Sequence, residues 1–372
     1  MSMVFPLNDE KSNRLEQMIE YLTTSYKLYW LYGILIEIER GKQEITFREI
    51  VTRMVTCCWY SLLKFKLHLG AVDKLYNLVV FIANRFNLSS DMPEEELYDF
   101  LQGLNDLDVD RRMTEFYKYV PYRLLQPFFS GELYCQQDYK KNGIIEACAI
   151  RSGEVFYKVY TADRKILVSP DWASYIVRNQ AIINGWMHSK LINFLQRKNP
   201  SVPGIPLKIA APRERDLSPA RKFWSAVIEL EQPVDIYTGY ELNKENFSQF
   251  GNLSIDHFIP WSFVLHDQMW NLIPTFRNIN STKNDKLPPF DPCLDRFCQL
   301  HYMAFSTACK HDRLRKYAED YVIIDNTLYP CLSTGKLVAE RIFKQTIKQA
   351  VVPLYQIAQN QGFGLWILPN NS

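Results

Sequence analysis

The residues best suited to chemistry lie in one short stretch. Asp256 and His257 are adjacent, Asn271 follows fourteen residues later, and Asn280 follows nine further on. Hydrolysis of a phosphodiester needs a divalent cation on the phosphate, and carboxylate and amide oxygens suit such a hard cation. It also needs a base that titrates near neutral pH, which histidine provides, and a third group that orients the imidazole. The spacing therefore predicts a metal-assisted hydrolytic site, provided that a strand, a loop and a helix converge.

The segment 234–287 resembles the HNH nuclease family, also called the ββα-metal fold. The match rests on the strings SIDHFIPWS, WNLIPT and NINSTK and covers roughly 50–60 residues. The resemblance implies that Asp256 and Asn280 are metal ligands, with Mg²⁺ as the cation and Mn²⁺ as the alternative. It implies that His257 is the general base and that Asn271 orients it. The third residue of the motif is Asn280 rather than histidine, a variant that the family tolerates.

Basic residues near this motif are candidate contacts for the phosphates of a nucleic acid. The resemblance places Lys283, one helical turn after Asn280, near the scissile phosphate, and Arg277 could also reach phosphate. A solvated helix position is the alternative for Lys283. A further basic run precedes the segment and consists of Arg213, Arg215, Arg221 and Lys222. It has two interpretations: contacts to the phosphates along a duplex groove, or a solvated linker.

The segment departs from the family at the positions where many members bind a structural zinc through two C-x-x-C pairs. Here those positions hold Asp235 with Thr238, and Phe276 with Ile279. None of the four is the cysteine that such a zinc site requires. We therefore expect no structural zinc, and we expect Phe276 and Ile279 to pack as a small apolar core.

Two of the motif residues also have simpler interpretations. A histidine after an acidic residue on an apolar strand is commonly structural, but the downstream Asn-Leu-Ile-Pro-Thr and Asn-x-x-Lys context favours a catalytic role for His257. For Asn271, a capping or turn role fits the same placement.

Helical patterns surround this stretch on both sides. Residues 9–130 predict helices, with a capping-box pattern at Thr46 and Glu49 and an N-cap at Asp73. Alternation over 154–168 predicts a hairpin, and one long helix is expected from Ser169-Pro170-Asp171 to about Arg197. Four prolines between 200 and 212 then indicate a linker.

The remaining pattern predicts a short helix from Ser218, two strands with a long loop from Val234, and helices after Pro288-Pro289. We therefore expect a mostly helical α+β chain with an embedded ββα-metal module. The expected parts are an N-terminal helical region (1–131), a hairpin with a long helix (132–200), a linker with the nuclease module (201–290) and a C-terminal helical region (291–372).

Composition narrows the class of protein. The chain has 372 residues, of which 47% are hydrophobic, and its formal net charge is +2. These values exclude a disordered or histone-like protein, so any nucleic-acid site must be a local patch. No apolar run is long enough to span a bilayer, and eight cysteines in so long a chain do not suggest a disulfide scaffold. We expect a cytoplasmic protein with no membrane partner.

The function that follows is a metal-dependent HNH endonuclease acting on nucleic acid, with double-stranded DNA favoured. Helical regions of this size beside an HNH module suggest phage defence or restriction, with partner subunits of a defence system. Two alternatives stay open: a catalytically inactive nucleic-acid-binding or regulatory module, and an RNA-cleaving toxin.

Overall fold

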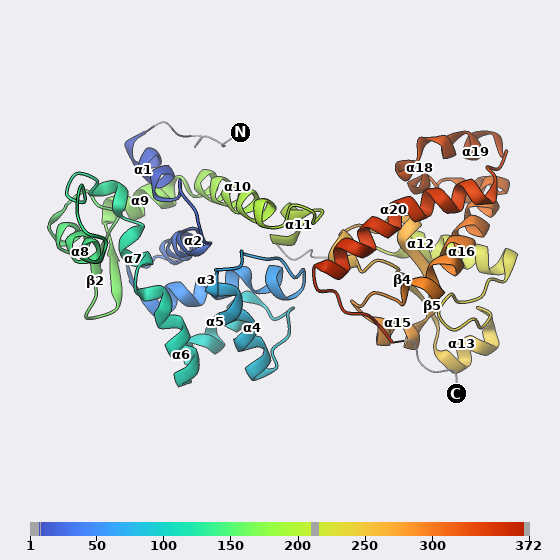
Figure 1. Ribbon diagram of the computed structural model, residues 1–372, viewed down its shortest axis with the longest axis horizontal. Coiled ribbons are helices and arrows are strands. Elements are labelled where there is room, and N and C mark those ends of the chain that lie inside the picture. Colours follow the sequence, from blue (N-terminus) through green and yellow to red (C-terminus); the bar gives the residue numbers. More distant parts are fainter. Residues whose placement is uncertain (1–6, 8, 210–215, 368–372) are drawn as a thin grey trace. The chain divides into compact units, whose positions relative to one another are not determined.

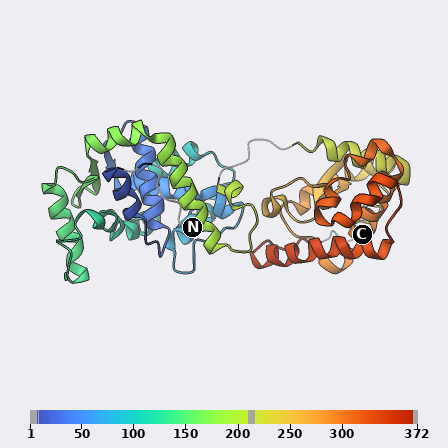
Figure 2. The same cartoon turned by 90° about the horizontal axis from the view of Figure 1, so that it is seen from above.

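A computed structural model describes residue 7, residues 9–209 and residues 216–367 (Figure 1). The chain forms two compact units that divide near Pro200, with Ser201–Leu207 in the second unit and a short segment around Lys208 in the first. Figure 2 gives a second view of the same elements. The predicted mostly helical α+β class is confirmed, whereas the division into four parts stays a prediction.

The first unit contains a three-stranded antiparallel sheet in the order β1-β3-β2, surrounded by helices. The strands are β1 (Glu44–Thr46), β2 (Tyr157–Tyr160) and β3 (Lys165–Val168). The helices are α1 (Glu10–Met18), α2 (Tyr26–Glu39), α3 (Phe47–Leu63), α4 (Lys74–Phe86), α5 (Glu94–Gly103), α6 (Leu107–Thr114), α7 (Val120–Arg123), α8 (Lys141–Arg151), α9 (Pro170–Arg178) and α10 (Gln180–Lys198), and α11 (Ile205–Ile209) lies at the division between the units.

Local capping explains where the helices of this unit begin. Thr46 accepts a hydrogen bond from the Glu49 amide while the Glu49 carboxylate accepts one from the Thr46 amide, which is the predicted capping box of α3. Asp73 is the N-cap of α4, and its side chain accepts a hydrogen bond from the Leu75 amide. Both predictions are confirmed, as is the β2–β3 hairpin.

Two features of the first unit differ from the sequence interpretation. The long helix expected from Ser169 is interrupted at Asn179, whose side-chain amide donates to the Tyr175 carbonyl and whose backbone leaves the helical region (φ −108°, ψ 17°). Such side-chain hydrogen bonds compete with the helical ladder. The pairing of β1 with β3, where Ile45 lies opposite Ile166, joins residues far apart in sequence and was not predicted.

The second unit places a two-stranded sheet among helices. Its strands are β4 (Leu253–His257) and β5 (Leu272–Phe276). Its helices are α12 (Ser218–Glu231), α13 (Lys244–Phe250), α14 (Trp261–Val264), α15 (Arg277–Lys283), α16 (Phe290–Lys310), α17 (Asp312–Arg315), α18 (Asp320–Ile324), α19 (Tyr329–Thr334) and α20 (Glu340–Asn360).

Strands β4 and β5 with helix α15 form the expected ββα module. The strands are antiparallel, with Asp256 opposite Ile273 and His257 opposite Leu272. Pro274 lies within β5 and pairs with Ile255; a proline is tolerated because no third strand requires its missing N–H. Helix α15 begins directly after β5, so the chain passes from strand to helix without a connecting loop.

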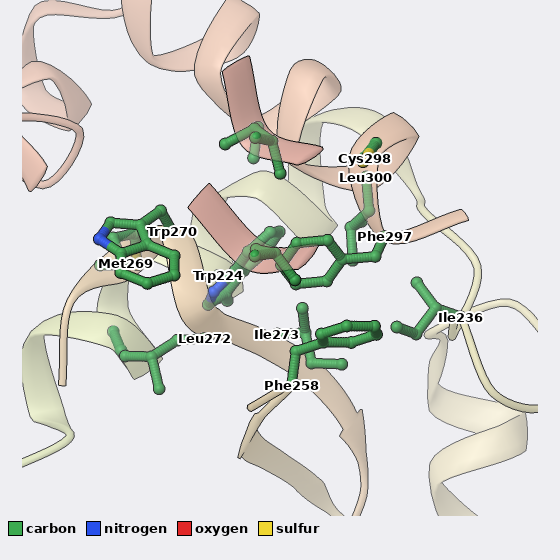
Figure 3. Packing of buried hydrophobic residues seen from close by; sticks show 14 of the residues in the cluster. Trp224, Ile236, Phe258, Met269, Trp270, Leu272, Ile273, Phe297, Cys298 and Leu300 are labelled. Carbon is green, nitrogen blue, oxygen red and sulfur yellow. The ribbon is translucent and has the colours of Figure 1, made fainter. Parts of the chain in front are cut away.

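A large apolar core formed with helices α12 and α16 supports this module. Trp224 of α12, Ile273 of β5 and Phe297 of α16 are fully buried in it (Figure 3). Phe258, directly after β4, packs on Phe297 with ring centroids 4.1 Å apart. The end of β4, which carries the motif residues, is therefore anchored on packed aromatic rings. Among the described residues, no helix has both the length and the apolar character needed to cross a bilayer.

Candidate active site

Asp256, His257 and Asn280 line one pocket of about 390 Å³ on the second unit. Asp256 and His257 are the last two residues of β4, and Asn280 lies midway along α15. Strand β4 packs directly against α15, so residues 24 positions apart in sequence (280 minus 256) face the same space. The three residues expected to bind the cation and activate water are thus brought together.

Two hydrogen bonds fix the Asn280 side chain. Its Nδ2 donates to the Ser254 hydroxyl at 2.8 Å and to the Ile255 carbonyl at 3.2 Å. Because both bonds use the amide nitrogen, Oδ1 is the atom that remains for a cation. This orientation matches the metal-ligand role that the motif implies for Asn280.

Asp256 is buried and is held by two donors. The Tyr237 hydroxyl donates to Oδ2 at 2.6 Å, and Lys283 Nζ lies 3.1 Å from each carboxylate oxygen. Burial and the charge of Asp256 raise the pKa of Tyr237 well above its usual value, so the phenol stays protonated and donates. Trp366, near the C-terminal end of the described residues, packs edge-on against the Tyr237 ring and supports this contact.

Lys283 has a different environment from the phosphate contact that the sequence suggested. Its side chain is fully buried, and Nζ also donates to the His257 carbonyl at 2.8 Å. The ammonium therefore neutralises the Asp256 carboxylate and ties the end of α15 to the end of β4. A group enclosed in this way holds the Asp256 carboxylate and does not extend to the pocket surface where a substrate would lie.

The imidazole of His257 is paired with Asp267, a residue that the motif does not include. Nε2 lies 2.7 Å from Oδ1 of Asp267, which belongs to the loop between α14 and β5. The only sequence signal for this contact is an acidic residue in the loop between the motif histidine and Asn271. Its distance from His257 could not be derived from spacing.

Asn271 acts on the backbone that follows His257. Its Oδ1 accepts from the Ile259 amide and its Nδ2 donates to the Ile259 carbonyl, both at 2.9 Å. The Asn271 carbonyl also accepts from the Phe258 amide. These bonds hold the chain directly after His257, whereas the predicted direct orientation of the imidazole by Asn271 stays a prediction.

Substitution of Asn271 by alanine should destabilise the second unit. The side chain is fully buried, so its loss leaves the amide and carbonyl of Ile259 unpaired. At about 1–3 kcal/mol for each of the two buried unpaired groups, we expect the free energy of unfolding to fall by about 2–6 kcal/mol. Urea denaturation of the full chain measures this. The exposed Asn278→Ala on α15 is the matched control, and equal stability of the two variants would refute the role.

The basic residues are distributed unevenly around the pocket. Arg221 of α12 lines it and donates to the Leu253 carbonyl at 2.9 Å. Arg277 begins α15 and is exposed, but it is not among the lining residues. Lys222 is exposed beside Arg221, and Arg213 and Arg215 lie outside the described residues.

The four positions where the family resemblance suggested a possible zinc site have other roles here. Asp235 Oδ2 accepts from the amide and hydroxyl of Thr238, which closes a turn completed by Gly239 at φ +77°. Phe276 and Ile279 are buried, and Phe276 packs against two rings of α13. The predicted apolar core at these two positions is confirmed. Across residues 7, 9–209 and 216–367, no group of three or more His, Cys, Asp or Glu side chains is arranged to hold a metal ion.

The pocket nevertheless fits a divalent cation that takes only two ligands from the protein. The Asp256 carboxylate and the Asn280 amide oxygen are hard oxygen donors that face one pocket. Mg²⁺ commonly binds through one or two protein oxygens and completes its shell with water and substrate phosphate. A carboxylate also has lone pairs enough to accept from Tyr237 and Lys283 and still bind a cation.

Comparison with known proteins identifies a family for this segment. Residues 235–289 match the model of the family described as HNH endonuclease. The chain is also similar to a protein named CRISPR-associated endonuclease Cas9 from Listeria innocua serovar 6a, with 37% identity over 62 residues; the match covers 17% of this chain and 4% of that protein. No solved structure matches the chain significantly. The predicted resemblance is confirmed: residues 235–289 are an HNH endonuclease domain.

Proposed function

We propose that the protein is a metal-dependent endonuclease that hydrolyses phosphodiester bonds of nucleic acid, with double-stranded DNA as its substrate. The observation that carries the proposal is the meeting of Asp256, His257 and Asn280 at one pocket of an HNH domain. Arg221 and Arg277 are the proposed phosphate contacts, because both are exposed, positively charged side chains beside the module.

In the proposed mechanism, Asp256 and Asn280 would hold Mg²⁺, with Mn²⁺ as a substitute. When bound, the cation neutralises charge that develops on the phosphate and on the leaving oxygen. His257 takes a proton from the water that attacks phosphorus, and the 3′ oxygen leaves. Lys283 and Tyr237 keep the Asp256 carboxylate in place during the reaction. By similarity to the family, the product carries a 5′-phosphate.

The biological setting is part of the same proposal. A large helical unit joined to an HNH domain supports a cytoplasmic role in phage defence or restriction, together with partner subunits. This inference rests on domain combination and not on a residue of the site.

Purified full-length chain should nick or linearise supercoiled plasmid in Mg²⁺ or Mn²⁺, and an excess of EDTA should stop cleavage because Asp256 and Asn280 then lack the cation. Gel electrophoresis of plasmid and tRNA incubated in parallel measures the outcome. Cleavage of tRNA alone would favour the RNA-cleaving toxin. If neither is cut in either metal, the inactive binding module becomes the better interpretation.

A further inference from the structure

Asp267 lies against the proposed general base although no motif assigns it a role. Its Oδ1 is 2.7 Å from Nε2 of His257, and the two side chains are 26% and 7% exposed. A carboxylate only accepts hydrogen bonds, so Nε2 must be the donor in this pair. The neutral ring then carries its hydrogen on Nε2 and its lone pair on Nδ1.

The loop that carries Asp267 is held at both ends. Before Asp267, the Leu265 amide donates to the Trp261 carbonyl. After it, the Met269 amide donates to the Asp320 carboxylate at 2.7 Å, and Met269 and Trp270 are buried in the core. These anchors set the position of Asp267 before any substrate is present, as a preorganised site requires.

His266, which precedes Asp267, is not a charged competitor of His257 for the Asp267 carboxylate. Burial and the charge of His257 lower the pKa of His266 to about 4, so its ring is neutral near neutral pH. Its Nδ1 accepts from the Gln268 amide at 3.4 Å. The pairing of Asp267 with His257 is therefore not weakened by a second imidazolium from His266.

We propose that Asp267 is a positioning residue that fixes the His257 ring with the hydrogen on Nε2, so that Nδ1 takes the proton from the attacking water. The inference rests on the nuclease function proposed above. In the step, the proton moves from water to Nδ1, the Nε2 hydrogen stays in its bond to Asp267, and the carboxylate stabilises the imidazolium that forms. Asp267 thus acts through the His257 ring and not on the phosphate itself.

The first test reads the tautomer directly and does not depend on activity. The full chain is labelled with ¹⁵N in its histidine rings, kept free of metal, and studied by NMR at a pH where the His257 ring is neutral. Signals of His257 are assigned by their loss in His257→Ala. We expect hydrogen on Nε2 in the wild type, and a shift toward a mixture in Asp267→Asn, because an amide can donate as well as accept.

The second test measures single-turnover cleavage of plasmid in Mg²⁺. Asp267→Asn should lower the rate on the order of 10²-fold with little change in DNA affinity, since the carboxylate acts through His257 and not on DNA. Asp267→Glu should recover part of the rate, because it restores a carboxylate. The matched control is Glu245→Gln, which removes an exposed charge on α13.

The outcomes separate this inference from the function on which it rests. A wild-type ring with hydrogen on Nδ1, or an unchanged rate in Asp267→Asn, would overturn the positioning role. A wild type that cuts nothing, while Asp267→Asn still shifts the tautomer, would refute the nuclease function and support the contact. Loss of rate that Asp267→Glu does not recover, with no change in tautomer, would reduce Asp267 to a structural residue of the loop.

Discussion

The His257→Ala variant should lose nearly all cleavage while keeping its fold. General-base catalysis contributes about 10²–10⁴-fold to a rate, and we expect a loss of that order in the single-turnover rate on plasmid. His257 lines the pocket, and its backbone carbonyl, which binds Lys283, is retained in the variant. The proposed metal ligands Asp256 and Asn280 are also unchanged, so the defect should lie in the chemical step and not in metal or DNA binding.

The control for this variant is His311→Ala, which removes an exposed histidine of the same unit away from the pocket lining. It should cut at the wild-type rate. DNA binding in Ca²⁺, measured by fluorescence anisotropy, should be the same for all three proteins. Equal cleavage by His257→Ala and wild type would show that another group activates water, and the assignment of the base would fail.

The sequence predicted those parts of the fold that depend on neighbouring residues. The capping box at Thr46 and Glu49, the N-cap at Asp73 and the hairpin around residues 157–168 each follow from side chains a few positions apart. The ββα module was predicted for a different reason, because the spacing of its motif residues is characteristic of a family. The pairing of β1 with β3 has neither a local signal nor a motif, so it appears only in the structure.

The same distinction applies to the site. Asp256, His257 and Asn280 were identified from residue type and spacing, and the structure brings them to one pocket. The contact of Asp267 with His257 depends on how a loop folds back, which spacing does not encode. The environment of Lys283 was missed because the last residue of a short helix can point to solvent or inward, and only the packing of α15 on β4 decides between these directions.

The buried pair of Lys283 and Asp256 leads to the second large prediction, which concerns stability. Both side chains are almost completely enclosed, with exposed fractions of 0% and 5%. Removal of one partner from a buried ion pair leaves an uncompensated charge and costs about 3–5 kcal/mol. Lys283→Met, which keeps an unbranched apolar chain one atom shorter and removes the ammonium, should lower the free energy of unfolding of the second unit by this amount.

The reverse experiment separates charge pairing from simple packing. In the double variant Asp256→Asn/Lys283→Met, neither charge of the pair remains, so the double variant should be more stable than Lys283→Met alone. The double-mutant cycle of these two positions should give a coupling energy above about 1 kcal/mol. Lys222→Met, at an exposed position of α12, controls for loss of a surface charge and should be neutral.

Magnesium should affect these variants unequally, because Asp256 is both the partner of Lys283 and a proposed metal ligand. In Lys283→Met the cation is the remaining counter-charge for Asp256, so millimolar Mg²⁺ should raise the thermal midpoint of this variant more than that of the wild type, by mass action on the folded state. The variant with Asp256→Asn as well should lose that response. Thermal denaturation with and without Mg²⁺ measures the change in thermal midpoint of the wild type, Lys283→Met and the double variant. A Lys283→Met protein as stable as wild type, with impaired DNA affinity, would return Lys283 to the phosphate-contact role inferred from the motif.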